Sequence, residues 1–219
     1  MRASLCHESG GLVYHLRALR YRKTLWRPFV EQVGKWLASW QPPQKDLLVV
    51  GPSAGYTLSA PFLARFERID ILEPDPLAQW ILGRRFPGQV FHAGKLDCFK
   101  TENGARQLRE TYPDHAILFS NVIGQMPDEN GAWKRNLVEA MRRTSWASYH
   151  DLISTSRKPD RNGSATRPAE TSLEAVLGHF WQGGELEIRD HGTFGFDPTE
   201  TAYAPWSITP DQHHLVAWN

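Results

Sequence analysis

The sequence has few cysteines, little net charge and no long apolar run, and each of these absences excludes a class of protein. Its 219 residues include two cysteines, Cys6 and Cys98, which are too few and too far apart for a disulfide framework or a C-x-x-C metal site. No uncharged apolar run approaches the roughly 18 residues of a membrane helix. The first residues lack the apolar core of a secretory signal. We therefore expect a cytoplasmic protein without a membrane partner.

The charge is unevenly distributed, although the net charge is only +1. Residues 1–45 contain eight Lys and Arg against two acidic residues, so this head is basic and the rest of the chain is acidic. Leucines and aromatic residues recur at helical spacing in this head, which predicts one or two amphipathic helices interrupted near Pro28. We expect a basic N-terminal helical extension over 1–45 that docks on an acidic domain over 46–219. Contact with nucleic acid through the basic head is the open alternative.

Apolar runs and helical patterns alternate after residue 45. Runs typical of buried strands occupy 46–51, 68–75, 89–94, 115–123 and 145–155, and helical patterns occupy 57–66, 76–86, 103–112, 131–144 and 171–181. Parallel strands need crossover connections, and these are right-handed. The alternation therefore predicts an α/β fold with a Rossmann-like doubly wound sheet, mostly parallel, and helices on both faces.

The end of the chain has a different pattern. Residues 184–194 and 213–219 read as strands with no helix between them, so we expect these two strands to pair antiparallel. The segment between them, 195–212, is rich in proline and aromatic residues. We expect it to form a lid or surface loop in which Tyr203 and Trp206 close over a flat substrate.

The first predicted strand ends in a glycine-bearing turn. Gly51, Ser53 and Gly55 fit the G-x-S-x-G nucleophile elbow of serine hydrolases, and they also fit a turn that lets a nucleotide-type ligand approach the backbone. Several strands precede the elbow in hydrolases, whereas only basic helices precede Ser53. A ligand-binding turn further predicts an acid at the end of the next strand, and Glu73 stands there. A serine hydrolase that uses Ser53 stays as an alternative.

With these residues the chain resembles the class I S-adenosylmethionine-dependent methyltransferases over residues 46–155, with weaker agreement to 219. The resemblance implies S-adenosylmethionine as the cofactor and a sheet that ends in an antiparallel strand pair. The first glycine motif is degenerate, because Val49 stands where the family usually carries an acid and Ser53 where it carries its middle glycine. The resemblance assigns cofactor contacts to Gly51, Ser53, Gly55, Glu73, Asp75, Asp97 and Ser120.

The acceptor side of the site is predicted from the ends of the fourth and fifth strands. His150 is the expected general base, since the pKa of imidazole lies near neutrality, or else a buried histidine satisfied at a strand end. Asp151 lies beside it, and Asn121 is expected to orient a carbonyl of the substrate or cofactor. Because the histidines lie on separate predicted strands, we expect no metal site.

We therefore expect an enzyme that transfers a methyl group to a small molecule, with nucleic acid as the less favoured acceptor. Val49 and Ser53 motivate a second hypothesis, a methyltransferase-like binding protein that has lost catalysis.

Overall fold

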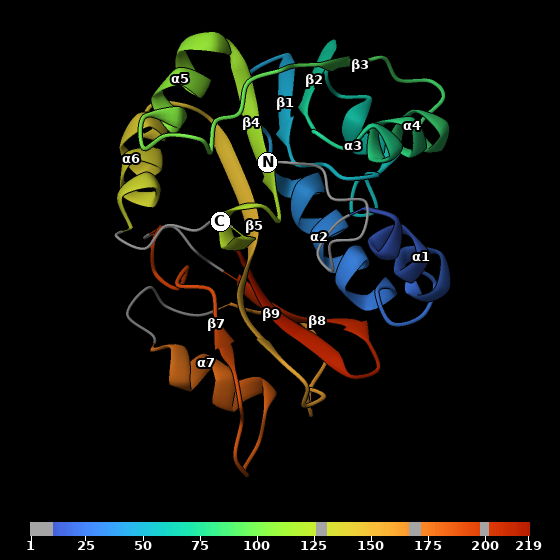
Figure 1. The fold of residues 1–219 in the computed structure, drawn as a ribbon, viewed down its shortest axis with the longest axis vertical. Helices are drawn as coiled ribbons and strands as arrows, with labels where there is room; N and C mark the ends of the chain where they lie inside the picture. The colour runs from blue at the N-terminus through green and yellow to red at the C-terminus, as the bar shows by residue number, and fades with distance from the viewer. Residues whose placement is uncertain (1–10, 126–130, 167–171, 198–201) are drawn as a thin grey trace.

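A twisted sheet with helices on both faces forms the frame of the molecule (Figure 1). The structure is a computed structural model that describes residues 11–125, 131–166, 172–197 and 202–219. Its helices are α1 (Gly11–Tyr21), α2 (Arg27–Ser39), α3 (Ala60–Leu63), α4 (Pro76–Arg85), α5 (Gly104–Thr111), the 3₁₀ turn η1 (Ile123–Gln125), α6 (Ala132–Met141) and α7 (Leu173–Phe180). Its strands are β1 (Asp46–Val50), β2 (Arg68–Leu72), β3 (Phe91–Ala93), β4 (His115–Ser120), β5 (Trp146–Thr155), β6 (Ala165–Thr166), β7 (Arg189–Asp190), β8 (Ala202–Thr209) and β9 (Gln212–Trp218).

The strand order confirms the predicted fold class. Along the sheet the order is β3-β2-β1-β4-β5-β9-β8-β6, and β7 pairs with β5 off this path. Strands β1 to β5 pair in parallel, as the alternation with helices requires. Strand β9 then runs antiparallel to both β5 and β8. The fold is thus a Rossmann-like, mostly parallel sheet that ends in an antiparallel C-terminal pair.

Strand β1 is buried on both faces, which explains its continuous aliphatic run. Leu47 and Val49 pack in the hydrophobic cluster that includes residues of α2, α3 and α4. Leu48 and Val50 pack on the other face, in the cluster formed with α5 and α6. Figure 1 shows these two groups of helices on opposite sides of the parallel strands. A polar residue in β1 would therefore be buried without a water partner.

The N-terminal helices pack directly against the sheet. The N-terminal segment forms two helices, and Pro28 lies in the first turn of the second, α2, just after the break between them. Trp26 and Phe29 are buried in the cluster that covers one face of the sheet, and the Phe29 ring stacks on that of Trp206 at 4.6 Å between centroids. Residues 1–10 of the predicted basic head lie outside the described residues. The division of the chain after residue 45 stays a prediction.

The end of the chain departs from the predicted pairing. Within 184–194 only β7 is a strand, and it pairs with β5 instead of with β9. Strand β8 lies within the predicted lid, 195–212, and Tyr203 and Trp206 are buried in it, so neither forms a lid over a substrate. Pro205 obscured this strand in the sequence. Among the described residues β6 pairs only with the start of β8, so Pro205 lies where its missing N–H breaks no ladder.

No helix in the described part of the chain combines the length and the apolar character needed to cross a membrane.

Candidate functional site

The carboxyl ends of β1 and β4 mark the place where a ligand binds in such a sheet. The strand order reverses between these two strands, because β2 and β3 continue on one side and β5 on the other. Open α/β sheets bind ligands in the crevice beyond the carboxyl ends of the strands at this point. Gly51, Ser53 and Gly55 follow β1 there, with φ angles of +66°, +49° and +65°. Three of the five residues 51–55 have a left-handed backbone conformation, which bends the chain sharply away from the strand.

Glu73 joins this turn to the end of β2. One carboxylate oxygen accepts a hydrogen bond from the Ser53 backbone N–H at 2.8 Å, and the other accepts from the Asp75 backbone N–H at 3.0 Å. Asp75 in turn caps α4 through the Leu77 N–H at 2.9 Å. Burial raises the pKa of the Glu73 carboxyl, and the two backbone N–H groups oppose the rise. The structure thus brings three of the predicted cofactor residues, Ser53, Glu73 and Asp75, into one hydrogen-bonded unit, and the Gly51 N–H ties the start of the turn to the Leu72 carbonyl of β2 at 2.9 Å.

The remaining predicted cofactor residues lie at the ends of β3 and β4. Asp97 is exposed after β3, and its carboxylate accepts the Phe99 backbone N–H at 3.2 Å. Ser120 ends β4, and its hydroxyl lies 2.6 Å from that of Tyr149. Thr57 approaches the same phenol at 2.8 Å. Burial raises the pKa of Tyr149 to about 12, so this group stays a neutral hydrogen-bonding hydroxyl.

Asn121 and Asp151 meet on the β5 side of the crevice. The Asn121 side-chain N–H₂ donates to the Asp151 carboxylate at 3.2 Å, and its backbone N–H donates to the Tyr149 carbonyl at 2.9 Å. Burial raises the pKa of Asp151, but the charges of His214 and His191 and the hydrogen bonds from His214 and Asn121 outweigh it, so the net shift is downwards. Asp151 is therefore an ionised carboxylate with 2% of its surface exposed.

His150 is not part of this group. It is fully buried, its Nδ1 lies 2.8 Å from the Ser148 hydroxyl, and its ring packs edge-on against Phe196. Side chains alternate along β5, so His150 points away from the face that carries Tyr149 and Asp151. The strand continues to Thr155, past both residues, so the alternation holds at His150.

Helix α1 contributes two residues that the sequence did not single out. His15 Nδ1 lies 3.0 Å from the Tyr56 hydroxyl, and His15 Nε2 lies 3.6 Å from an Asp75 carboxylate oxygen. Tyr14 packs against Tyr56, with ring centroids 5.8 Å apart. Burial raises the pKa of Tyr14, and carboxylates from both sides of the crevice, Glu73 and Asp151, add to the rise. Helical periodicity marked α1 as amphipathic, but it gave no signal that these side chains face the crevice.

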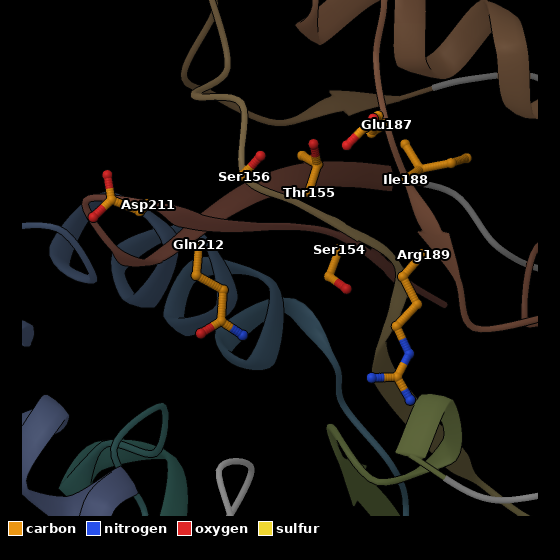
Figure 2. Close-up of a pocket in the computed structure, with 8 residues that line it drawn as sticks. All are labelled: Ser154, Thr155, Ser156, Glu187, Ile188, Arg189, Asp211 and Gln212. Carbon is orange, nitrogen blue, oxygen red and sulfur yellow. The ribbon is translucent and has the colours of Figure 1, made fainter.

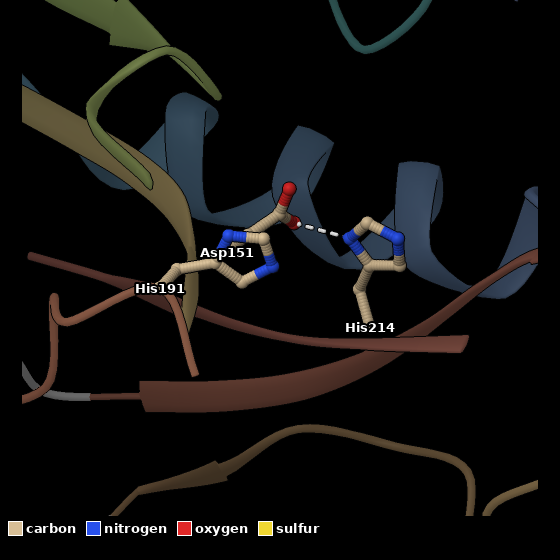
Figure 3. Close-up of side chains that lie close together, drawn as sticks. All are labelled: Asp151, His191 and His214. Carbon is tan, nitrogen blue, oxygen red and sulfur yellow. Dashed lines mark ion pairs between the residues drawn. The ribbon is translucent and has the colours of Figure 1, made fainter. Parts of the chain in front are cut away.

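Two histidines from distant segments lie beside Asp151 (Figure 3). His214 of β9 places Nδ1 3.0 Å from an Asp151 oxygen, and His191 follows β7. One ligand atom from each of the three residues lies within 4.8 Å of the other two. The sequence contained both histidines, but their proximity depends on the pairing of β5 with β7 and β9.

A second concave surface adjoins these residues, since Ser154 is the cross-strand partner of His214 and Gln212 contacts the His214 ring. It is an open hollow of about 360 Å³ at the end of β5, beside β7 and the β8–β9 turn (Figure 2). It is lined by Ser154, Thr155, Ser156, Glu187, Ile188, Arg189, Asp211 and Gln212. None of the predicted site residues lines this hollow.

Comparison with known proteins gives no match to a family model and none to a curated protein. Solved structures with a similar course of the chain include the N-methyltransferase NodS from Bradyrhizobium japonicum WM9 in complex with S-adenosyl-L-homocysteine, at 11% identity, 89% coverage of this chain, 86% of that chain and a TM-score of 0.47. The DhpI–SAH complex is similar at 13% identity, 93% and 92% coverage and a TM-score of 0.43. The glycopeptide N-methyltransferase MtfA with S-adenosyl-L-methionine is similar at 10% identity, 86% and 92% coverage and a TM-score of 0.40.

These TM-scores lie below 0.5, so function has to be derived from this chain's own side chains. Five parallel strands followed by an antiparallel pair give this chain a Rossmann-like sheet, which is the fold that its resemblance to the class I S-adenosylmethionine-dependent methyltransferases predicted.

Proposed function

We propose that the chain is a cytoplasmic methyltransferase that uses S-adenosylmethionine and acts on a small molecule. The observation that carries the proposal is the hydrogen bond from the Ser53 N–H to Glu73, which makes the turn after β1 and the acid after β2 one site at the reversal of strand order. When bound, the cofactor supplies an electrophilic methyl group on a sulfonium.

The residues of this site fit the proposed cofactor. A carboxylate offers about four lone-pair positions, and Glu73 uses two of them on backbone N–H groups, so each oxygen can still accept a ribose hydroxyl. Ser53 holds the left-handed φ that the family's middle glycine adopts freely, so the turn keeps its shape in spite of the substitution. Asp97 is exposed at the next strand end, where a carboxylate can accept from an amino group.

Asn121 and Asp151 are the proposed residues of the acceptor side. The cofactor would supply the methyl group and leave as a thioether, and the acceptor would release its proton to solvent as the product departs. The protein's part is to align the two reactants and to exclude water. An ionised carboxylate such as Asp151 stabilises the positive charge that develops on the attacking atom. His150, buried on the opposite face, holds no position on the acceptor in this proposal.

A small acceptor agrees with the surface of α1. Its exposed side carries Leu12, Leu16 and Leu19, each with more than half of its surface exposed. A surface that tracks a phosphate backbone is dominated by Lys and Arg instead. We therefore keep nucleic acid as the second candidate acceptor.

The hydrolase alternative lacks support in the geometry around Ser53. A nucleophile elbow passes directly from strand to helix, whereas nine residues separate the end of β1 from the start of α3. In the part of the chain that the structure describes, no histidine hydrogen-bonds to Ser53; His191 and His214 gather at Asp151.

Calorimetric titration with S-adenosylmethionine and S-adenosylhomocysteine tests the proposal. We expect one site per chain, and we expect Glu73→Gln to bind about 10- to 100-fold more weakly, because it loses charge-assisted hydrogen bonds to the ribose. Glu67→Ala is the matched control, since Glu67 is an exposed acid paired with Lys45 in the segment that precedes β2. Absence of binding of both compounds at millimolar concentration would refute the proposal. Labelling of Ser53 by a fluorophosphonate would support the serine hydrolase instead.

A further inference from the structure

We propose that Asp151, His191 and His214 bind one divalent transition-metal ion. The three side chains come from β5, from the segment after β7 and from β9, and Figure 3 shows them turned toward one another. Two imidazoles and one carboxylate form a donor set that selects zinc, cobalt or iron over magnesium or calcium.

The three candidate ligand atoms lack other partners. Asp151 Oδ1 and His214 Nδ1 contact each other at 3.0 Å and have no further partner in the described part of the chain, and His191 Nε2 is a buried atom that makes no hydrogen bond there. Such atoms cost free energy when they are left unsatisfied, and a native protein ordinarily satisfies them. A single metal ion would satisfy all three.

The distances suit a shared ion. Two ligands bonded at ~2.1 Å and at the tetrahedral angle lie ~3.4 Å apart. Asp151 Oδ1 and His214 Nδ1 are 3.0 Å apart, and all three ligand atoms lie within 4.8 Å of one another. His191 therefore needs a movement of at most about 1.4 Å to complete the site, and it lies in the segment that follows a two-residue strand.

The outer nitrogen of His191 is already held. His191 Nδ1 lies 3.1 Å from the Gly124 carbonyl, which fixes its proton on that nitrogen and leaves Nε2 with a free electron pair. Metal-binding histidines almost always make such a bond with their second nitrogen. His214 Nε2 instead accepts from the Gln212 side-chain N–H₂ at 3.1 Å, which places the proton of the neutral ring on Nδ1, so metal binding at Nδ1 would release that proton.

A β-bulge and a glycine next to the cluster help to position Asp151 and His191. A β-bulge between Asp151 and Ile153 shifts the register against β9, and bulges of this kind re-aim side chains beside functional sites. A Cβ on Gly124 would lie 2.4 Å from the Asp151 carbonyl oxygen, so only glycine lets η1 come close enough for its carbonyl to meet His191.

The ion would keep an open coordination position. Three protein ligands leave at least one site on a four-coordinate metal, and catalytic sites use that position for water or substrate. We assign it to an oxygen or nitrogen of the methyl acceptor, an assignment that rests on the proposed function. The Asn121 side-chain N–H₂ donates to Asp151 on the crevice side, and its Oδ1 is a buried atom with no hydrogen-bond partner among the described residues. The acceptor class is thus a small molecule with a metal-binding hydroxyl, carboxylate or amine.

Titration of the chelator-treated full-length chain with Co²⁺, followed by visible absorption and by competition with Zn²⁺, tests the metal site. We expect one ion per chain and no comparable binding of Mg²⁺. Asp151→Asn keeps the size of the side chain, and His191→Gln changes a partly exposed residue; each should weaken Co²⁺ binding by more than about 100-fold, since loss of outer partners alone costs about 10- to 100-fold.

His92→Gln is the matched control, because it removes an exposed imidazole on β3. Binding of less than one ion, or equal binding by Asp151→Asn and His92→Gln, would overturn the metal site. The titration needs no S-adenosylmethionine. Failure here with normal cofactor binding would refute the metal site alone, whereas metal binding without cofactor binding would refute only the proposed function.

Discussion

Replacement of Gly51 by alanine tests the geometry of the turn after β1. Gly51 has a φ of +66°, and an added Cβ would lie 2.0 Å from Val122 Cγ1. The left-handed conformation costs a non-glycine residue about 1–2 kcal/mol, and overpacking against a stiff branched side chain adds about 1–3 kcal/mol. We therefore expect Gly51→Ala to lower the free energy of unfolding by about 2–5 kcal/mol. For a chain of this size that corresponds to a fall of about 4–20 °C in Tm.

Two further variants separate the backbone term from the packing term. Gly183 has a φ of +65° with no atom within 4 Å of an added Cβ, so Gly183→Ala should cost only the backbone term of about 1–2 kcal/mol. Val122→Ala removes the clashing methyl group, so the double variant with Gly51→Ala should recover about 1–3 kcal/mol relative to the sum of the single changes. Urea unfolding, followed by tryptophan fluorescence, measures the free energy of unfolding of the three single variants, of the double variant and of the unchanged protein. Equal losses for Gly51→Ala and Gly183→Ala, or no recovery in the double variant, would refute the close approach of Val122.

Two other predictions concern buried ionisable groups. Burial raises the pKa of Cys98 to about 12. In a Cys6→Ser background the Cys98 thiol should therefore react with alkylating reagents at pH 8 about a thousandfold more slowly than a free thiol, and it should react at the rate of a free thiol once the chain is unfolded. Rapid labelling of the native chain would contradict its burial. Burial raises the pKa of Asp70, but hydrogen bonds from Arg68 and His115 outweigh it and leave the pKa below its ordinary value of 3.8. The ionised carboxylate therefore stabilises the fold above that value and loses its contribution as the pH falls through the lowered pKa. Asp70→Asn should cost about 1 kcal/mol at pH 7 and little near pH 2, and a difference independent of pH would show that the charge is irrelevant.

The sequence predicted the parallel half of the sheet because local signals were sufficient there. Continuous aliphatic runs such as 46–51 are buried on both faces, and a helical pattern follows nearly every one of them. The neighbourhood of Glu73 and Ser53 follows from the same logic, since parallel neighbours β1 and β2 end at the same edge. Strand β8 was missed because Pro205 is typical of loops, and its edge position is visible only in the sheet.

The grouping of Asp151 with two histidines depended on long-range pairing. His191 and His214 lie 40 and 63 positions after Asp151. The position of these histidines on separate strands is an argument against a shared metal site only as long as the order of the strands in the sheet is unknown. Strand β9 lies directly beside β5, and Val216, the cross-strand partner of Asp151, is two residues from His214 on the same face. Diagonal neighbours of this kind are within reach of long side chains.

The two halves of the proposed site therefore depend on different pairings of one sheet. The turn after β1 and Glu73 are positioned by the parallel pair β1–β2, whereas Asp151 and His214 are positioned by the antiparallel pair β5–β9. Asn121 follows β4, between these pairs, and its hydrogen bonds go to the β5 side, to the Tyr149 carbonyl and the Asp151 carboxylate. Among the described residues no hydrogen bond joins Glu73 or Ser53 to Asp151 or His214, so a change in Glu73 should weaken binding of the cofactor without weakening binding of the metal ion. The antiparallel end of the sheet then has a chemical consequence as well as a structural one: a parallel continuation would have required a crossover and would have carried His214 away from Asp151.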